Sequence, residues 1–589
     1  MFLKTTNLKN GRSYLSIVEG YRLDGKVKQR TIKKIGFLDE LLKDYDDPIS
    51  HFKAVADQMT SEAKDDTQLL LPINTYAPIG IADSSKNVGY IALKRIYDAI
   101  DFASFFKPIQ IKKSCDYSLN KIFQLLVFSR ILFPASKKET FDSKDVFFQP
   151  FQHFSLKDLY RSLDDFSVMK SQMEQWIWLH TKEAYQRDAS HTYYDCTNYY
   201  FEIAYNDEDL IDEYGTILEK GYRKRGPEKN KRPDPIISMG LLMDANGIPL
   251  SYELFPGNES EKTTVRPIVK RTKANFAINK TIVVADRGLN TSDNMYFLAG
   301  KNDDVHRNHD GYVYGQSVRG GDKEFKSWVL AHEGYQAELI KDGENEVAFI
   351  HKSRVYGKSV KIKRDGKRNV NVIIYQKQLA YYSSTYARKQ KKEREQMIAK
   401  AKELIKKPGN YTKATSYGAA NYVNNLVFDK ETGEIKTDTI LTLDKEKISE
   451  EEKYDGFYSI VTSEKELSDK EIRDIYRGLI KIEDTFKVSK TNLKSRPVYV
   501  WTKEHIEAHF LTCFVSLVLT RLLEKRLENN YSVNQITESL KKYNCINIDK
   551  NLYQFIYRDE VIEAIEKAFK IDLNKKYRKK EEIRKLLRY

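Results

Sequence analysis

The chain has 589 residues, with 99 Lys or Arg against 84 Asp or Glu, so its formal net charge is +15 at pH 7. Hydrophobic residues make up 41% of it and aromatic residues 12%, which excludes an intrinsically disordered protein. The basic balance predicts a polyanionic partner and favours nucleic acid over an anionic membrane surface. The apolar runs are too short to span a bilayer, the N-terminus has no apolar signal core, and the four cysteines form no CxxC motif. We therefore expect a cytosolic protein without a membrane partner.

The N-terminal part predicts a small basic β module followed by a linker. Ser13–Arg22 and Lys28–Ile35 have the pattern of strands, and Asp24–Gly25 between them is a typical hairpin turn. We therefore predict a β-hairpin module over residues 1–45. Residues 46–88 are polar and irregular, which favours a linker.

Residues 89–187 have the period of helices. Ile122, Leu125 and Leu126 belong to one apolar stripe, and Pro134 interrupts the pattern. One interpretation is a compact helical domain that binds a DNA end. A plain helical bundle without a ligand fits the same residues equally well.

Residues 188–319 alternate between strand and helix patterns. The expected strands are one from His191 into Asp195, then Ile236–Met243, Pro249–Phe255, Thr281–Ala285 and Gly311–Val318, with helices near Lys262–Lys273 and Ser292–Leu298. Three strands followed by helix, strand, helix and strand is the order of the ribonuclease H-like fold. We therefore assign residues 188–319 to the first part of such a core.

The next segment interrupts this core. Residues 320–452 contain strand patterns and a long charged helix at Leu379–Lys407, so we predict a mostly β insertion domain with a core of its own. Residues 453–528 return to the core, and residues 529–589 are typical of a basic helical C-terminal region. The predicted fold is α/β: a ribonuclease H-like catalytic core interrupted by the β-rich insertion, with an N-terminal β-hairpin, a helical DNA-binding region and a helical tail.

One helix, predicted over Ser468–Lys490, carries an unusual row of side chains. It begins with a capping box formed by Ser468 and Glu471. Tyr476, Glu483 and Lys490 follow at intervals of seven residues, which places them in one row on the helix surface. A carboxylate flanked by a phenol and an ammonium can hold a metal ion against a phosphate. An amphipathic helix with ordinary surface charges is the alternative.

Three acidic residues are expected to converge on one site. Asp195 closes the first predicted core strand, Asp286 closes the fourth, and Glu483 lies on the returning helix. The first and fourth strands are neighbours in a ribonuclease H-like sheet. Three nearby carboxylates repel one another unless cations neutralise them, and their oxygens suit Mg²⁺ or Mn²⁺. Two such ions about 4 Å apart can activate a water or a 3′-hydroxyl for phosphodiester displacement.

Three sequence blocks carry a resemblance to a known family: YYDCTNYYFE around Asp195, TIVVADRGLN around Asp286, and IYRGLIKIEDTFKVSKTNLKSRPVYVWT around Glu483. Through them, roughly residues 190–525 resemble the DDE transposases of bacterial insertion sequences, in the insertion-sequence-four superfamily. Members of that family carry a β-rich insertion between the second Asp and the Glu. The resemblance implies that Asp195, Asp286 and Glu483 bind two Mg²⁺ or Mn²⁺ ions and are the catalytic residues.

The family's signature helix has Tyr, Arg, Glu and Lys at set spacing. Tyr476, Glu483 and Lys490 fit it, but Leu479 holds the usual arginine position and Arg477 lies two residues earlier. The resemblance implies that Tyr476 and Lys490 hold phosphates near the metal ions, and Arg477 is a candidate for the arginine contact.

Further candidate DNA-binding residues surround these blocks. Arg287 and Asn258 lie beside the acids and either contact DNA or stabilise their loops. The basic loop GYRKRGPEKNKR resembles a phosphate-contacting run, with a solvated charged loop as the alternative. Its candidate residues are Arg223, Lys224, Arg225, Lys229, Lys231 and Arg232.

The resemblance implies a Mg²⁺-dependent DNA transposase. Such an enzyme binds the terminal inverted repeats of its element, cleaves strands at the ends, and transfers the 3′-hydroxyls to target DNA. Its partner is double-stranded DNA, a homodimer is expected in the synaptic complex, and the protein is expected in the bacterial cytoplasm, associated with the nucleoid when active. Two other functions stay open: a ribonuclease H-like nuclease without strand transfer, and a binding-only regulator of transposition.

Overall fold

The computed structural model describes all residues except 9–10, 24–25, 66–83, 228–232, 300–309, 343–344, 363–369, 430–431, 437–439, 550 and 589. The chain forms two compact units, Met1–Ile81 and Ala82–Tyr589. The predicted Asp24–Gly25 turn and the basic residues Lys229, Lys231 and Arg232 lie outside the described residues.

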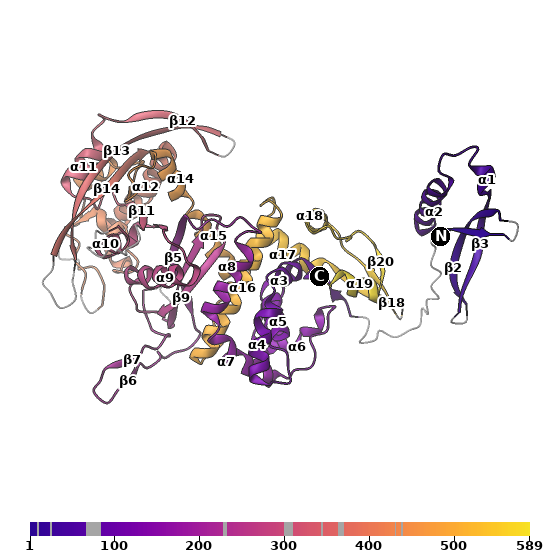
Figure 1. Cartoon of the computed structure of the whole chain (residues 1–589). Helices are drawn as coiled ribbons and strands as arrows, with labels where there is room; N and C mark the ends of the chain where they lie inside the picture. Colours follow the sequence, from indigo (N-terminus) through magenta and orange to yellow (C-terminus); the bar gives the residue numbers. More distant parts are fainter. Residues whose placement is uncertain are drawn as a thin grey trace. The chain divides into compact units, whose positions relative to one another are not determined.

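The N-terminal unit contains a three-stranded antiparallel sheet and two helices (Figure 1). The strands β1 (Phe2–Asn7), β2 (Ser13–Leu23) and β3 (Lys26–Phe37) lie in sequence order and are followed by α1 (Leu38–Leu41) and α2 (Pro48–Asp65). The predicted pair of strands is therefore present, and β1 adds a third.

The linker predicted over residues 46–88 is wrong over Pro48–Asp65, which form α2. Phe52, Val55, Ala56 and Met59 are spaced as the apolar stripe of a helix, and this signal is hidden among polar residues. Ala56 is 1% exposed and lies in the small core of the unit.

The second unit begins with the predicted helices. They are α3 (Ile91–Ala99), α4 (Phe102–Lys113), α5 (Leu119–Leu132), α6 (Lys137–Asp142), α7 (Leu156–Ser167) and α8 (Lys170–Thr181). The later helix α16 (Lys503–Arg526) packs among α3, α5 and α7. One hydrophobic core runs through these helices and the central sheet, so the helical region is part of the larger unit rather than a separate domain.

Helix α16 is long and apolar enough, by length and composition alone, to cross a membrane, which the short apolar runs did not predict. In the structure 89% of its apolar window is buried inside the protein. This burial explains the apolar composition, because the helix forms the centre of the core rather than its surface.

A nine-stranded mixed sheet forms the centre of the second unit, in the order β12-β13-β14-β17-β11-β10-β5-β8-β9. The strands are β5 (His191–Tyr200), β8 (Ile236–Asp244), β9 (Pro249–Pro256), β10 (Ile282–Ala285), β11 (Gly311–Gln316), β12 (Gln336–Asp342), β13 (Asn345–Ile362), β14 (Val370–Tyr382) and β17 (Phe457–Thr462). β10 pairs in parallel with β5 and β11, and the other neighbours are antiparallel. The five strands predicted within residues 188–319 are therefore present.

The two faces of the sheet pack against different helices. Because strand side chains alternate between faces, Tyr194 points to one side of β5 and Tyr193 to the other. The Tyr194 hydroxyl donates to Thr264 Oγ1 at 2.7 Å, which lies on α9 (Glu261–Phe276). Together with α10 (Ser292–Ala299), α9 contributes to the core on this face, and the opposite face belongs to the core that contains α16.

Contrary to the prediction, the segment 320–452 is not a separate, mostly β domain. After α11 (Lys323–Leu330), its strands β12, β13 and β14 extend the central sheet, because β14 pairs with β17. The pairing partner of a strand is a long-range property that its own residue pattern does not contain, and the alternation of these strands was compatible with either arrangement.

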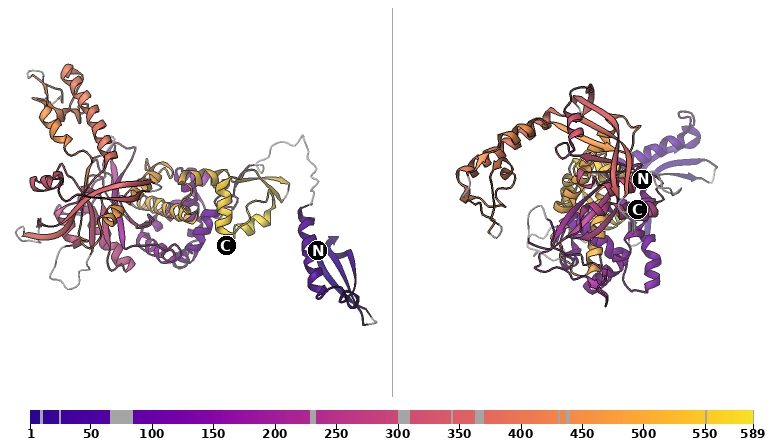
Figure 2. Two further views of the ribbon diagram at one scale, coloured as in Figure 1. Left: turned by 90° about the horizontal axis from the view of Figure 1, so that it is seen from above. Right: turned by 90° about the vertical axis from the view of Figure 1, so that its left-hand side faces the viewer.

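The remainder of the segment is mostly helical. It contains α12 (Ser384–Lys406), the two-residue strands β15 (Val423–Asn424) and β16 (Thr442–Leu443), and α13 (Lys445–Glu452). A small core of its own includes Ala401 and Leu404 of α12. Its elements project away from the sheet in the left view of Figure 2.

The C-terminal region is not wholly helical as predicted. Helices α17 (Val533–Lys542), α18 (Glu560–Phe569) and α19 (Lys580–Leu586) alternate with strands β18 (Asn544–Asp549), β19 (Leu552–Phe555) and β20 (Tyr577–Lys579). These strands form a four-stranded sheet with β4 (Lys86–Asn87). The end of the chain therefore pairs with residues that precede the first helix of the unit.

Candidate active site

The predicted helix over Ser468–Lys490 is divided into two. α14 (Asp469–Arg477) begins with the predicted Ser468–Glu471 capping box, and α15 (Ile480–Thr491) follows after Gly478 and Leu479. A Cβ at residue 478 would clash with the Tyr193 hydroxyl, so glycine lets the turn approach β5 closely. The prediction of one continuous helix is therefore wrong at Gly478, because contact with the sheet determines the backbone conformation there.

Helix α15 lies against the face of β5 that contains Asp195. The Lys490 ammonium donates to Thr197 Oγ1, and the hydroxyls of Tyr199 and Ser489 are hydrogen-bonded at 2.9 Å. Asp195, Thr197 and Tyr199 are two residues apart along β5, so their side chains point to the same side of the sheet. Asp195 and the returning helix therefore face each other.

The register of two strands brings Asp286 beside Asp195. β10 pairs in parallel with β5 from Ile282 opposite His191 to Val284 opposite Tyr193. Two more residues in this register carry Asp286, directly after β10, to the level of Asp195. Asp195 does not end its strand as predicted, because β5 continues to Tyr200.

Asp286 is held by two hydrogen bonds. Its Oδ1 accepts the Arg287 backbone N–H at 2.7 Å and the Tyr476 hydroxyl at 3.4 Å. Burial raises the pKa of Tyr476, and the adjacent Asp286 charge raises it further. The phenol therefore stays protonated at neutral pH and acts as a donor that orients the carboxylate.

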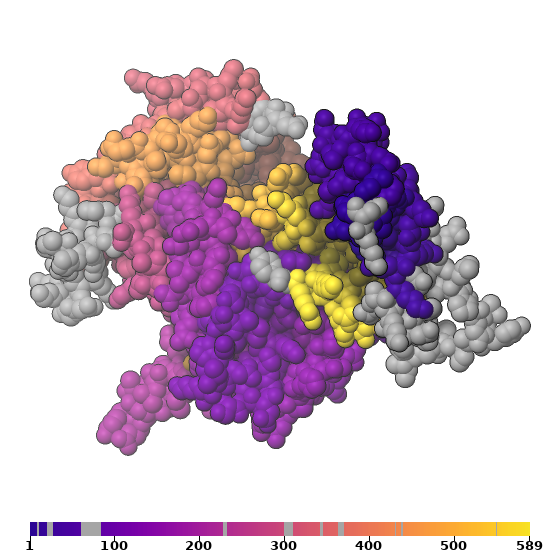
Figure 3. All heavy atoms as spheres, turned by 45° about the vertical axis from the view of Figure 1, so that its right-hand side comes forward, coloured from indigo at the N-terminus to yellow at the C-terminus, as the bar shows by residue number. Residues whose placement is uncertain are grey.

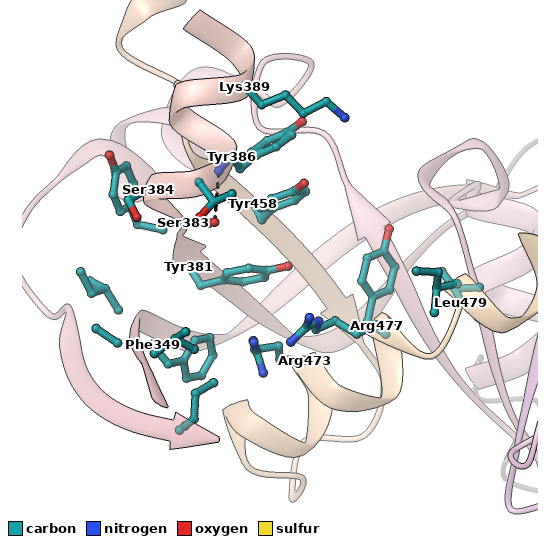
Figure 4. A pocket seen from close by; sticks show the side chains of 18 of the residues that line it. Phe349, Tyr381, Ser383, Ser384, Tyr386, Lys389, Tyr458, Arg473, Arg477 and Leu479 are labelled. Carbon is teal, nitrogen blue, oxygen red and sulfur yellow. Dashed lines mark hydrogen bonds between the residues drawn. The ribbon is translucent and has the colours of Figure 1, made fainter. Parts of the chain in front are cut away.

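Asp195, Asp286 and Glu483 line one cavity of about 850 Å³. Tyr476 and Arg477 line it as well, and Figure 4 shows Arg477 at the cavity. Across the described part of the chain, no three His, Cys, Asp or Glu side chains come close enough together to hold a single metal ion. Asp195, Asp286 and Glu483 present carboxylate oxygens to the cavity, and these are the ligand type that Mg²⁺ and Mn²⁺ prefer.

The other predicted DNA-binding residues lie at different places. Lys490 contacts β5 at Thr197 rather than lining the cavity, and Leu479 lines the cavity next to Arg477. Arg287 is exposed directly beside Asp286. Asn258 is exposed in the turn after β9.

The same cavity is also lined by stacked aromatic rings that the sequence did not reveal. Tyr386 stacks on Tyr458 with ring centroids 4.0 Å apart, and Tyr458 stacks on Tyr381 at 5.3 Å. Figure 4 shows the three rings one above another, with Arg473 and Arg477 pointing toward the same space. The rings come from β14, β17 and α12, so only the strand pairing and the adjoining helix bring them together.

A polar cluster connects the strands of the insertion to the start of α14. Asp469 accepts a hydrogen bond from His351 Nδ1 at 2.7 Å and pairs with Lys377 at 2.9 Å. His351 stacks on Phe349, another residue of the cavity, with centroids 4.3 Å apart. Burial acts to raise the pKa of Asp469, but hydrogen bonds from Lys377 and His351 outweigh it and lower the pKa. The position of the helix that carries Tyr476 is thus linked to β13 and β14.

The basic loop after β7 is largely neutralised by acidic neighbours. Arg223 pairs with Asp207, and Lys224 pairs with Asp209 at 2.8 Å. The Arg225 guanidinium donates to the Pro233 carbonyl at 3.0 Å. The acids precede the small hairpin of β6 (Leu210–Ile211) and β7 (Ile217–Glu219), which protrudes from the surface (Figure 3). These three cations are therefore less available to phosphates than their sequence pattern predicted.

Comparison with known families places these residues in context. Residues 218–519, just over half of the chain, match the family model described as transposase DDE domain. Residues 3–69 match the model described as IS1634 family transposase, N-terminal domain. No curated protein matches the chain. The chain belongs to the DDE transposases of insertion sequences.

The matched range contains Asp286 and Glu483 and begins after Asp195. Asp195 is therefore supported by the strand register and the shared cavity rather than by the match. Family membership implies a nuclease or transposase activity on DNA and the use of divalent metal ions.

Proposed function

We propose that the chain binds the terminal inverted repeats of its insertion sequence, cleaves the strands at the ends, and joins the freed 3′-hydroxyls to target DNA. The observation that carries this proposal is the convergence of Asp195, Asp286 and Glu483 on one cavity, although they lie in three distant parts of the chain. The alternative of a binding-only regulator requires no such gathering of carboxylates.

A ribonuclease H-like core is part of the proposal. The strands β9-β8-β5-β10-β11 are adjacent in this order, which is 3-2-1-4-5 in the order of the chain. The second is antiparallel to the first and third, and the fourth and fifth are parallel to the first. This arrangement supports the fold expected from the element order.

Asp195, Asp286 and Glu483 would hold two Mg²⁺ or Mn²⁺ ions. When bound, such ions activate a water or hydroxyl nucleophile and stabilise the leaving oxygen. The protein's own contribution is positional: Tyr476 orients the Asp286 carboxylate, and Arg477 places a guanidinium at the cavity for a DNA phosphate. Lys490 adds a positive charge farther along α15.

The stacked rings of Tyr381, Tyr458 and Tyr386 offer aromatic surface to bases near the cleaved bond. In this proposal the partners are double-stranded transposon ends and target DNA, and a homodimer brings two ends together. The protein would act in the bacterial cytoplasm, at the nucleoid.

The test uses purified protein, Mg²⁺, and duplexes taken from the DNA that flanks the gene, both intact and already cut at the end. Wild type should cleave the intact ends and join the cut ends to a plasmid. Asp286→Asn and Glu483→Gln should each lower cleavage by at least about a hundredfold while leaving binding intact. Asp484→Asn is the matched control, because Asp484 is exposed beside Glu483 and pairs with Arg521.

The outcomes separate the three functions. Cleavage without joining would identify a nuclease. Binding without either reaction, even in Mn²⁺, would identify a regulator. A fully active Asp286→Asn variant would show that this residue is not part of the site.

A further inference from the structure

The N-terminal unit separates its charges between sheet and helix. Residues 2–37, which contain the three strands, have nine Lys or Arg and two acidic residues. Residues 46–65, which contain α2, have two Lys and five acidic residues. A polyanion is therefore attracted by the sheet and repelled by the helix.

The strand register defines two faces of this sheet. Leu15 and Ile17 are both completely buried, and they belong to the face that α1 and α2 cover. Gly36, opposite Leu15, lies against Leu41 of α1 on that face. Both helices contact the sheet, α2 through β1 and α1 through β2 and β3, and Figure 1 shows them beside it; we call the face that does not contain Leu15 and Ile17 the open face.

The open face carries a row of paired residues, Lys4 opposite Ser16 opposite Lys34. Lys4 and Lys34 are exposed, and the neighbouring Phe2 is 45% exposed. The Lys4 ammonium donates to Gln29 Oε1 at 2.9 Å, which places Gln29 on the same face. Ser16, on the central strand between the two lysines, is buried.

Within the described part of the unit, these two lysines differ from Arg12 and Arg30 in having no acidic partner. Arg12 pairs with Asp39 and Glu40, and Arg30 pairs with Glu19. Among the residues that the structure describes, no carboxylate pairs with Lys4 or Lys34. Their charges are therefore available to a ligand.

We propose that the open face of the β1–β2–β3 sheet, around Lys4, Gln29 and Lys34, is the surface by which the N-terminal unit binds duplex DNA, and that α2 faces away from the DNA. This inference rests on the proposed function and assigns DNA contact to a sheet instead of a helix. The axes of the two outer strands are about 10 Å apart, so side chains on the open face span a distance comparable to the major groove width of about 12 Å. Lys4 and Lys34 would contact phosphates, and the Gln29 amide can bond to a base edge or to the backbone.

The test measures salt-dependent DNA binding by the full chain. The variant Lys4→Gln with Lys34→Gln removes two charges from the open face. The matched control, Lys43→Gln with Lys53→Gln, removes two charges from exposed residues outside the sheet. The probe is a fluorescein-labelled duplex of about 30 base pairs from the DNA flanking the gene, with a scrambled duplex of equal length beside it.

Each lost phosphate contact should reduce the slope of log affinity against log salt by about 0.9. The open-face variant should therefore lose about 1.8 in slope and bind about tenfold more weakly, whereas the control should keep the wild-type slope. Circular dichroism should show both variants folded, because all four side chains are exposed.

An unchanged slope in the open-face variant, or an equal loss in the control, would overturn the assignment. If the wild type cleaves its ends but the open-face variant binds like wild type, only the sheet assignment fails. If the wild type binds no DNA at low salt, the proposed function fails as well.

Discussion

Residues 320–383 and residues 384–455 follow one another between the second and third acids, yet they are joined to the sheet differently. β13 and β14 pair from Ile350 opposite Tyr382 to Ile362 opposite Val370, and β14 in turn pairs with β17. The later segment leaves and returns at one point, where the Ser383 N–H donates to the Gly456 carbonyl at 2.8 Å. An insertion that is continuous in sequence can thus consist of one part inseparable from the sheet and one part attached at a hairpin end.

The two parts also differ in what they bring to the site. The first supplies Tyr381 and Phe349 to the cavity, and its His351 and Lys377 hold Asp469 at the start of α14. The second contributes chiefly through the first turns of α12, and much of the rest of it, from Met397 to Ile448, packs on a core of its own. We therefore expect the first part to support both stability and catalysis.

The largest effect should come from removing both parts. Replacing residues 320–452 by a short Gly/Ser linker deletes β12, β13 and β14 and leaves β17 without its partner on one side. The product should fail to fold, because the deletion exposes an edge of the sheet and opens the hydrophobic core at the same time. The measurement is soluble yield and a thermal melt. A soluble core that melts cooperatively would show that the whole insertion is an independent domain.

A smaller effect should come from Asp469→Asn. Removing one partner of this largely buried cluster should lower the free energy of unfolding by about 1–3 kcal/mol at pH 7. Because the folded pKa of Asp469 is lowered, its contribution exists above its unfolded pKa of about 3.9 and is lost as pH falls through the folded value. Urea unfolding of wild type and variant should therefore converge at pH values below the folded pKa of Asp469.

The matched control for this substitution is Glu450→Gln. The pKa of Glu450 is also lowered, by hydrogen bonds from Lys453 and Tyr454, but the residue is exposed and lies on α13. This variant should unfold like wild type at pH 7. A larger loss from Glu450→Gln than from Asp469→Asn would reverse the proposed roles of the two parts.

The smallest effect should come from excising residues 391–453 alone. The Gln390 side chain accepts a hydrogen bond from the Gly456 N–H at 2.8 Å, so a short Gly/Ser linker can join the two ends. Closure costs rise slowly with loop length, so stability should change by less than about 1 kcal/mol, and Tyr386 and Lys389 stay in place. Thermal unfolding of the excised variant, compared with that of wild type, measures this change in stability. Loss of cooperative unfolding would show that the outer part also supports the sheet.

The sequence predicted the features that depend on local pattern. Asp286 was placed after a short apolar strand, and the capping box of Ser468 was correct, because both are signalled by adjacent residues. The break at Gly478 was missed, since it depends on the approach of Tyr193 from a distant strand. The same reason explains why the sequence overestimated how available the basic loop is to phosphates, since Asp207 neutralises Arg223 only in the folded chain.

The strand pairings were the least predictable part of the fold. Lys86 and Asn87 pair with Cys545 and Asn544 across most of the chain, and no local pattern specifies such a partner. The pairing of β14 with β17 is likewise not specified by any local pattern. The stacked aromatic rings of the cavity depend on this pairing, so they could not be predicted either.

The central claim is that Asp195, Asp286 and Glu483 act as one site. The most direct measurement is the rate of end cleavage in Mg²⁺ by Asp195→Asn, by Glu483→Gln and by the double variant, with binding measured in parallel. Groups that act as a unit are not additive, so each single variant should lose nearly all activity and the double variant should be no worse. Near-wild-type cleavage by either single variant, or losses that multiply in the double variant, would contradict the account.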